Sequence, residues 1–260
     1  VNQMINHMNS VDTLYYRTMD TSEKQKPLVS HSVNVAIYAI KIGIGMKYER
    51  EQLIQLGIGA LLHDIGMAKV SEEIVNKNGK LTEKEFVHVK KHPQYGYKLL
   101  LSLGKEYEWL AEIALQEHER EGGQGYPRGL SGDDIIDHAK IIGLVSTYEA
   151  LTHQRPYRNR FLPYDAIKKI IEEQRGFFAS HIVRAMLTQL SVFPVNSCVR
   201  LNSNVIGKVV ETTKDHPLRP TIQLLYDFQG RKVQNKKIIK LQDSPLLYIK
   251  DTLFENDLPQ

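Results

Sequence analysis

The sequence has little cysteine, little net charge and no long apolar run. Its single cysteine, Cys198, excludes an internal disulfide and a cysteine-rich zinc site. A lone thiol fits a reducing compartment such as the cytoplasm. Apolar stretches such as residues 56–62 are far shorter than the about 20 residues that cross a bilayer, and residues 1–20 lack the apolar core of a signal peptide. We therefore expect no membrane span in this segment.

Charge and composition narrow the range of partners. The 260 residues include 34 Lys and Arg against 30 Asp and Glu, which gives a formal net charge of +4. This weak and dispersed excess argues against a DNA or RNA partner, so an anionic ligand needs a local basic site. With 42% hydrophobic and 25% charged residues, the composition is that of an ordinary globular protein. The sequence begins at Val1 rather than at Met, and we expect it to belong to a longer chain.

The hydrophobic period changes near residue 194. Before it, apolar residues three and four apart predict helices, for example over 33–46 and 131–151. After it, short runs of β-branched and apolar residues between turn signals predict strands. The sequence therefore predicts a mainly α fold, a helical bundle followed by a small C-terminal β module. The expected divisions are a helical lead-in at 1–29, a helical domain at 30–194 and a β-rich module at 195–260.

One predicted helix carries two histidines. Thr82 and Glu85 have the spacing of a capping box, which predicts that a helix opens there and continues to about residue 101. His88 and His92 are four residues apart, so they would share one face of that helix.

Five residues are candidates for a metal site. A helix predicted over residues 53–63 places a His-Asp pair at its end. Imidazole nitrogens and carboxylate oxygens ligate zinc, manganese, iron and nickel, and one carboxylate can bridge two ions of a hydrolase. A single histidine on a helix is more often a packed or solvated residue than a metal ligand. The sequence motifs around these residues therefore have to distinguish the two roles. The candidates are His31, His63, Asp64, His92 and His118.

Four motifs supply that setting. His63-Asp64-Ile65-Gly66 is followed by His92-Pro93, then by His118 with Gly123-Gln124-Gly125-Tyr126-Pro127, and last by Arg155-Pro156-Tyr157-Arg158. In order and spacing these motifs resemble the HD-GYP domain family over about residues 27–193. The resemblance implies an HD-type helical bundle with a divalent metal centre. It also implies hydrolysis of cyclic di-GMP to linear pGpG or GMP.

The resemblance also assigns the site residues. His63 and Asp64 take the catalytic positions, and Asp64 is expected to bridge two ions. One or two ions are expected, iron or manganese first, with zinc or nickel as alternatives. Cyclic di-GMP is the expected partner, and a homodimer or a signalling-protein partner is left open. The implied metal ligands are His31, His63, Asp64, His92, His118 and, as a substitute, Glu117; the implied substrate contacts are Gly125, Tyr126, Arg155 and Arg158, although the two arginines also fit a solvated basic loop.

Five residues depart from the family pattern: Pro27, Met67, Glu117, Gly122 and Ser146. Glu117 stands where a second consecutive histidine is usual, and a carboxylate can still ligate a hard or borderline ion. Ser146 replaces an aspartate, and a neutral hydroxyl is a far poorer ligand. Met67 replaces a frequent lysine and so removes a positive charge. Two alternatives therefore stay open: a catalytically degenerate HD-GYP module that binds cyclic di-GMP or a protein partner without efficient hydrolysis, and an HD hydrolase of another phosphoester.

Overall fold

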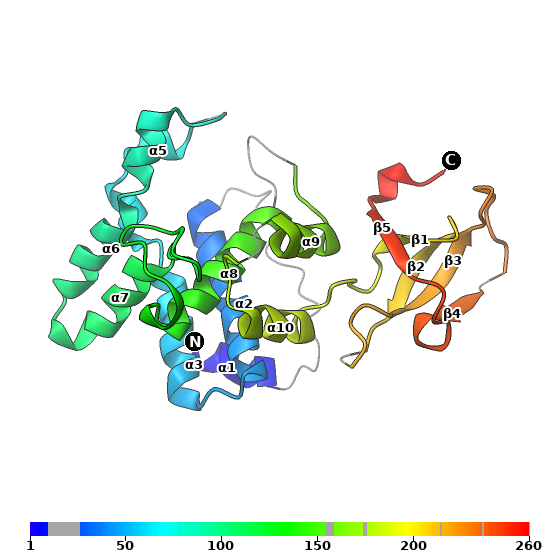
Figure 1. Ribbon diagram of the computed structural model, residues 1–260, viewed down its shortest axis with the longest axis horizontal. Coiled ribbons are helices and arrows are strands. Elements are labelled where there is room, and N and C mark those ends of the chain that lie inside the picture. Colours follow the sequence, from blue (N-terminus) through cyan, green and yellow to red (C-terminus); the bar gives the residue numbers. More distant parts are fainter. Residues whose placement is uncertain are drawn as a thin grey trace.

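The computed structural model describes residues 1–9, 27–77, 79–153, 159–173, 176–213, 215–235 and 237–259. Arg155 and Arg158 lie outside the described residues. Helices precede an antiparallel sheet (Figure 1), and the predicted mainly α fold with a small C-terminal β module is confirmed. The α-helices are α1 (Asn2–Asn9), α2 (Pro27–Gly45), α3 (Arg50–Leu62), α4 (Glu72–Val75), α5 (Glu83–Val89), α6 (His92–Leu101), α7 (Glu108–Gln116), α8 (Asp137–Thr152), α9 (Pro163–Glu173) and α10 (Ser180–Gln189).

Helix α2 is a core helix of the bundle and packs against α3 and α8. Val35, Ala36 and Ile40 are completely buried, as expected of a helix that is apolar on most sides. By length and composition its segment Leu28–Gly45 resembles a membrane span, yet 67% of that segment is buried inside the structure. The core of the bundle therefore accounts for the apolar side chains of α2.

The described part of the C-terminal sheet has five antiparallel strands in the order β4-β3-β2-β1-β5. It lies beyond α9 and α10, at the end of the molecule away from α6 and α7 (Figure 1). Thr252 Oγ1 donates to Asp165 Oδ2 in α9 at 2.7 Å, which ties the sheet to the bundle. The expected division at residue 194 stays a prediction. The strands are β1 (Cys198–Leu201), β2 (Ile206–Glu211), β3 (Thr221–Tyr226), β4 (Ile238–Lys240) and β5 (Ile249–Leu253).

The helix predicted from Thr82 to residue 101 is interrupted. The capping box is present, since Thr82 Oγ1 accepts from the amide of Glu85 at 3.3 Å, but α5 ends at Val89 and α6 begins at His92. Pro93 has no amide hydrogen, so it cannot bond the carbonyl of Val89 as a continuing helix requires. The prediction that His88 and His92 share a helix face was therefore wrong, and His92 instead begins a new helix.

Helix α8 begins at Asp137, six residues later than predicted. The backbone of the intervening segment is bonded elsewhere. Ser131 forms a β-bridge with Gly122, and the amide of Gly132 donates to the carbonyl of Glu121 at 3.0 Å. These bonds close the glycine-rich loop that precedes α8.

Candidate metal centre

Side chains from distant parts of the chain meet at one place in the bundle. They come from α2, from the turn after α3, from the first residue of α6 and from the turn after α7. The six predicted ligands form two overlapping groups, and within each group one ligand atom per residue lies within 4.8 Å of the others. The first group is Asp64, His92, Glu117 and His118, and the second group is His31, His63 and Asp64.

Asp64 belongs to both groups, and its two oxygens face different partners. Oδ1 lies 3.2 Å from His92 Nε2 in the first group. Oδ2 lies 3.4 Å from His63 Nε2 and 3.7 Å from His31 Nε2 in the second group. A carboxylate that presents one oxygen to each of two ligand sets can bridge two ions.

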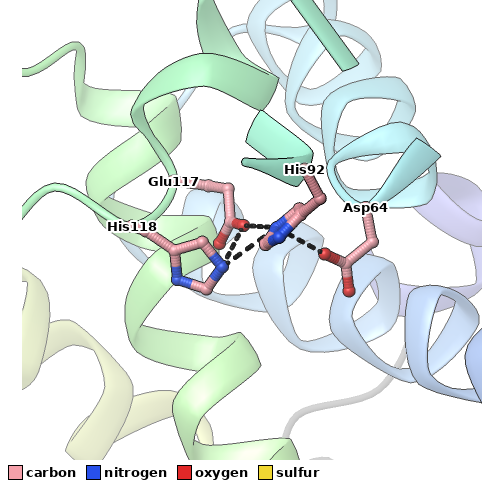
Figure 2. Close-up of side chains that lie close together, drawn as sticks. All are labelled: Asp64, His92, Glu117 and His118. Atoms are coloured by element: carbon pink, nitrogen blue, oxygen red, sulfur yellow. Dashed lines mark hydrogen bonds and ion pairs between the residues drawn. The ribbon is translucent and has the colours of Figure 1, made fainter. Parts of the chain in front are cut away.

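The first group converges on a small space (Figure 2). His118 Nε2 lies 2.7 Å from Glu117 Oε1 and 3.1 Å from His92 Nε2. His92 Nε2 is also 3.3 Å from Glu117 Oε1. Glu117 is the C-terminal cap of α7 and is 1% exposed, so its carboxylate has no access to bulk water. The structure thus brings the substitute carboxylate to the same centre as the imidazoles.

Two of the imidazoles are oriented by bonds through Nδ1. His63 Nδ1 donates to the carbonyl of Ala60, and His92 Nδ1 donates to the carbonyl of Val89, each at 2.8 Å. The Val89 carbonyl is the one that Pro93 leaves free. Because a carbonyl oxygen only accepts, Nδ1 carries a proton, and Nε2 is the nitrogen that faces the centre.

Glu149 is a site residue that sequence reasoning missed. It is 1% exposed in α8, where its carboxylate bonds His31 Nδ1 and accepts from Asn34 Nδ2 at 3.2 Å. This contact directs His31 Nε2 toward Asp64 and toward Ser146 Oγ, which lies 3.3 Å from it. Ser146 therefore does stand beside the second group. The available signal was the position of Glu149 one helical turn after Ser146.

The donor set fits a divalent cation. Burial raises the pKa of Glu117, but the imidazoles of His118 and His92 outweigh it and hold the pKa well below its usual value. Burial lowers the pKa of His92, yet hydrogen bonds to Asp64 and Glu117 raise it to about 10. Among the described residues, the buried atoms His63 Nε2 and Glu117 Oε2 make no hydrogen bond. Such unpaired atoms cost free energy, and cations bound in the two groups would satisfy them, Glu117 Oε2 in the first and His63 Nε2 in the second.

The Gly-Tyr-Pro loop lies against the first group. The ring of Tyr126 stacks on the imidazole of His118 with centroids 4.6 Å apart, and its amide donates to the carbonyl of His118 at 3.2 Å. A side chain at Gly125 would overlap that carbonyl and the Cα of Glu119, so the close turn requires glycine. The buried Glu119, also missed from the sequence, accepts from the amide of Arg128 at 2.7 Å and holds the loop.

Known proteins share this fold. The HD domain family matches residues 19–179, and a KOW domain associated with the HD domain matches residues 198–260. A solved structure described as an HDG"Y"P protein from Bdellovibrio bacteriovorus has a TM-score of 0.56 and 18% identity, over 71% of this chain and 60% of that one. The chain therefore belongs to the HD domain family.

Two relatives that are named as cyclic di-GMP phosphodiesterases are similar in sequence to this chain. The chain is 31% identical to a cyclic di-GMP phosphodiesterase of Pseudomonas aeruginosa, over 81% of this chain and 51% of that protein. It is 29% identical to a cyclic di-GMP phosphodiesterase of Borreliella burgdorferi, over 84% of this chain and 57% of that protein. The chain thus spans about half the length of these relatives. The resemblance to HD-GYP proteins is confirmed.

Proposed function

We propose that this chain is a metal-dependent phosphodiesterase that hydrolyses cyclic di-GMP to linear pGpG or GMP. The observation that carries the proposal is the placement of Asp64, whose two oxygens face two separate sets of imidazole Nε2 atoms. The names of the relatives support the choice of substrate. A cytoplasmic location and a homodimer or signalling-protein partner belong to the proposal as well.

Some residues of the chain would bind the metal ions and others would bind the substrate. His31, His63, Asp64, His92, Glu117 and His118 would hold the ions. When bound, divalent ions lower the pKa of water and offset negative charge at a phosphoryl centre. Burial, assisted by the Glu117 carboxylate, raises the pKa of Tyr126, so its hydroxyl stays protonated and can donate to a phosphate oxygen. Gly125 lets the backbone approach the ligand, and Arg155 and Arg158 would pair with its phosphates.

The two groups are expected to differ in metal affinity. The first group combines two carboxylates with two imidazoles, whereas the second has two imidazoles and shares its one carboxylate, Asp64. We therefore propose that one ion binds firmly in the first group and a second ion binds more weakly. Iron or manganese suits such mixed nitrogen and oxygen ligands, with zinc or nickel as alternatives.

Replacing Ser146 with aspartate should strengthen the binding of the second ion. The new carboxylate would lie beside His31 Nε2, where the serine hydroxyl now lies. We expect the dissociation constant of the weaker ion to fall by roughly tenfold, with that of the stronger ion unchanged. Metal titration of Ser146→Asp against Ser146→Asn measures this, because asparagine has similar size without the charge. Equal affinities in the two variants would show that the hydroxyl does not limit the second group.

Metal-loaded and metal-stripped protein incubated with cyclic di-GMP provide the test of function. Chromatography of the products should show pGpG or GMP from the loaded protein only. Binding without product would support the degenerate module, whose receptor role needs no turnover. Hydrolysis of another phosphodiester in place of cyclic di-GMP would keep the metal chemistry and change the substrate.

A further inference from the structure

Lys90 lies at the edge of the site, between two aromatic rings. It is the C-terminal cap of α5, half-buried, and its Nζ lies 4.9 Å from the ring centroid of Phe86 and 5.0 Å from that of Tyr126. Tyr126 in turn stacks on His118, a ligand of the first group. The ammonium of Lys90 is therefore one aromatic ring away from the candidate metal centre.

The N–H donors of the Lys90 ammonium are available to a ligand. Within the part of the chain that the structure describes, Lys90 Nζ forms no ion pair and no hydrogen bond that would use its three donors. Cation–π contacts hold it in place without neutralising its charge. The neighbouring Arg120 is already committed, since its Nη1 donates to the carbonyls of Glu117 and Glu119 at 3.0 and 2.8 Å.

An anionic substrate would need positively charged side chains near the site, and Lys90 supplies one. Met67 follows Asp64 in the short helix η1 (Ile65–Lys69), and its side chain brings no positive charge. A dianionic cyclic dinucleotide needs cations beyond the metal centre to hold the phosphate that is not being cleaved.

We propose that Lys90 forms a phosphate subsite that binds the phosphate of the cyclic dinucleotide that is not under attack. The proposal rests on the proposed function. Because Lys90 is separated from the ligand atoms by the Tyr126 ring, it is placed to hold the substrate rather than to take part at the reacting phosphorus. Phe86, which is 48% exposed, keeps the lysine chain directed toward this position.

The test compares Lys90→Met, which keeps the chain length and removes the charge, with Lys90→Arg, which keeps the charge. Lys91→Met is the matched control, because Lys91 is the exposed next residue and no side-chain bond is found for it among the described residues. For Lys90→Met we expect KM for cyclic di-GMP to rise about tenfold, with kcat, metal content and melting temperature close to wild type. Lys90→Arg should recover most of the loss, and Lys91→Met should match wild type.

A second substrate, which has only one phosphate, tests whether Lys90 binds the phosphate that is not cleaved. Bis(p-nitrophenyl) phosphate has a single phosphate, so Lys90→Met should hydrolyse it at the wild-type rate. A fall in kcat with unchanged KM, an equal loss on bis(p-nitrophenyl) phosphate, or an equal loss in Lys91→Met would overturn the subsite. If wild type does not hydrolyse cyclic di-GMP, the proposed function fails on its own. The subsite is then tested by calorimetric binding of cyclic di-GMP, and equal affinity of wild type and Lys90→Met, or no binding by wild type, refutes it.

Discussion

Replacing Asp64 with alanine is expected to reduce phosphodiester hydrolysis by at least about a thousandfold and to remove bound metal. The reason is that the aspartate faces both groups, so its loss leaves His92 on one side and His63 and His31 on the other without a shared carboxylate. Metal analysis of the purified variant and steady-state turnover measure the two effects. His63→Ala should behave similarly, because its Nε2 faces the same carboxylate.

The control for Asp64→Ala is Asp133→Ala, which removes an exposed aspartate in the segment before α8. It should keep wild-type metal content and turnover. Circular dichroism should show the same helical content in both variants, since Asp64 lies in a turn rather than in a helix. Unchanged turnover in Asp64→Ala would rule out the proposed metal mechanism.

Gly66 and Gly96 are expected to respond in opposite ways to alanine. A Cβ at Gly66 would overlap the carbonyl oxygen of His92 and come within 2.5 Å of the amide nitrogen of Gly96. These are backbone atoms of α6 that cannot move aside, so Gly66→Ala should push η1 off α6 and separate Asp64 from His92. We expect a loss of about 1–3 kcal/mol in the free energy of unfolding, with most of the bound metal lost.

Gly96→Ala is the matched control from the other side of the same contact. A Cβ there meets its nearest atom, the amide nitrogen of Gly66, at 3.4 Å, which is ordinary packing. Alanine also favours the helix by up to about 1 kcal/mol. We therefore expect equal or higher stability in denaturant unfolding and unchanged metal content. If both variants were tolerated equally, the contact between η1 and α6 would not set the position of Asp64.

Local sequence signals were sufficient for the bundle, whereas the candidate ligands were assigned by the resemblance to a family. The change of period near residue 194 marks the passage from helices to strands, because the two structures bury side chains at different intervals. The family motifs indicated His31, His63, Asp64, His92, Glu117 and His118, and the structure brings all six together. Their roles as ligands stay a prediction until an ion is bound.

Other features depend on contacts between distant segments, which one sequence does not display. Glu149 lies one helical turn after Ser146, but its partner His31 is 118 positions away in the sequence, so the position of Glu149 alone did not reveal the contact. His92 was assigned to the wrong helix because the capping box of Thr82 outweighed the effect of Pro93. Arg155 and Arg158 lie outside the described residues, and their pairing with phosphate is still a prediction.

Anomalous X-ray scattering from crystals soaked in manganese would test the metal centre most directly. We expect one strong peak bounded by Asp64, His92, Glu117 and His118, and a weaker peak between Asp64, His31 and His63. Both peaks should disappear in Asp64→Ala. Peaks elsewhere in the chain, or none at these side chains under saturating manganese, would contradict a shared metal centre.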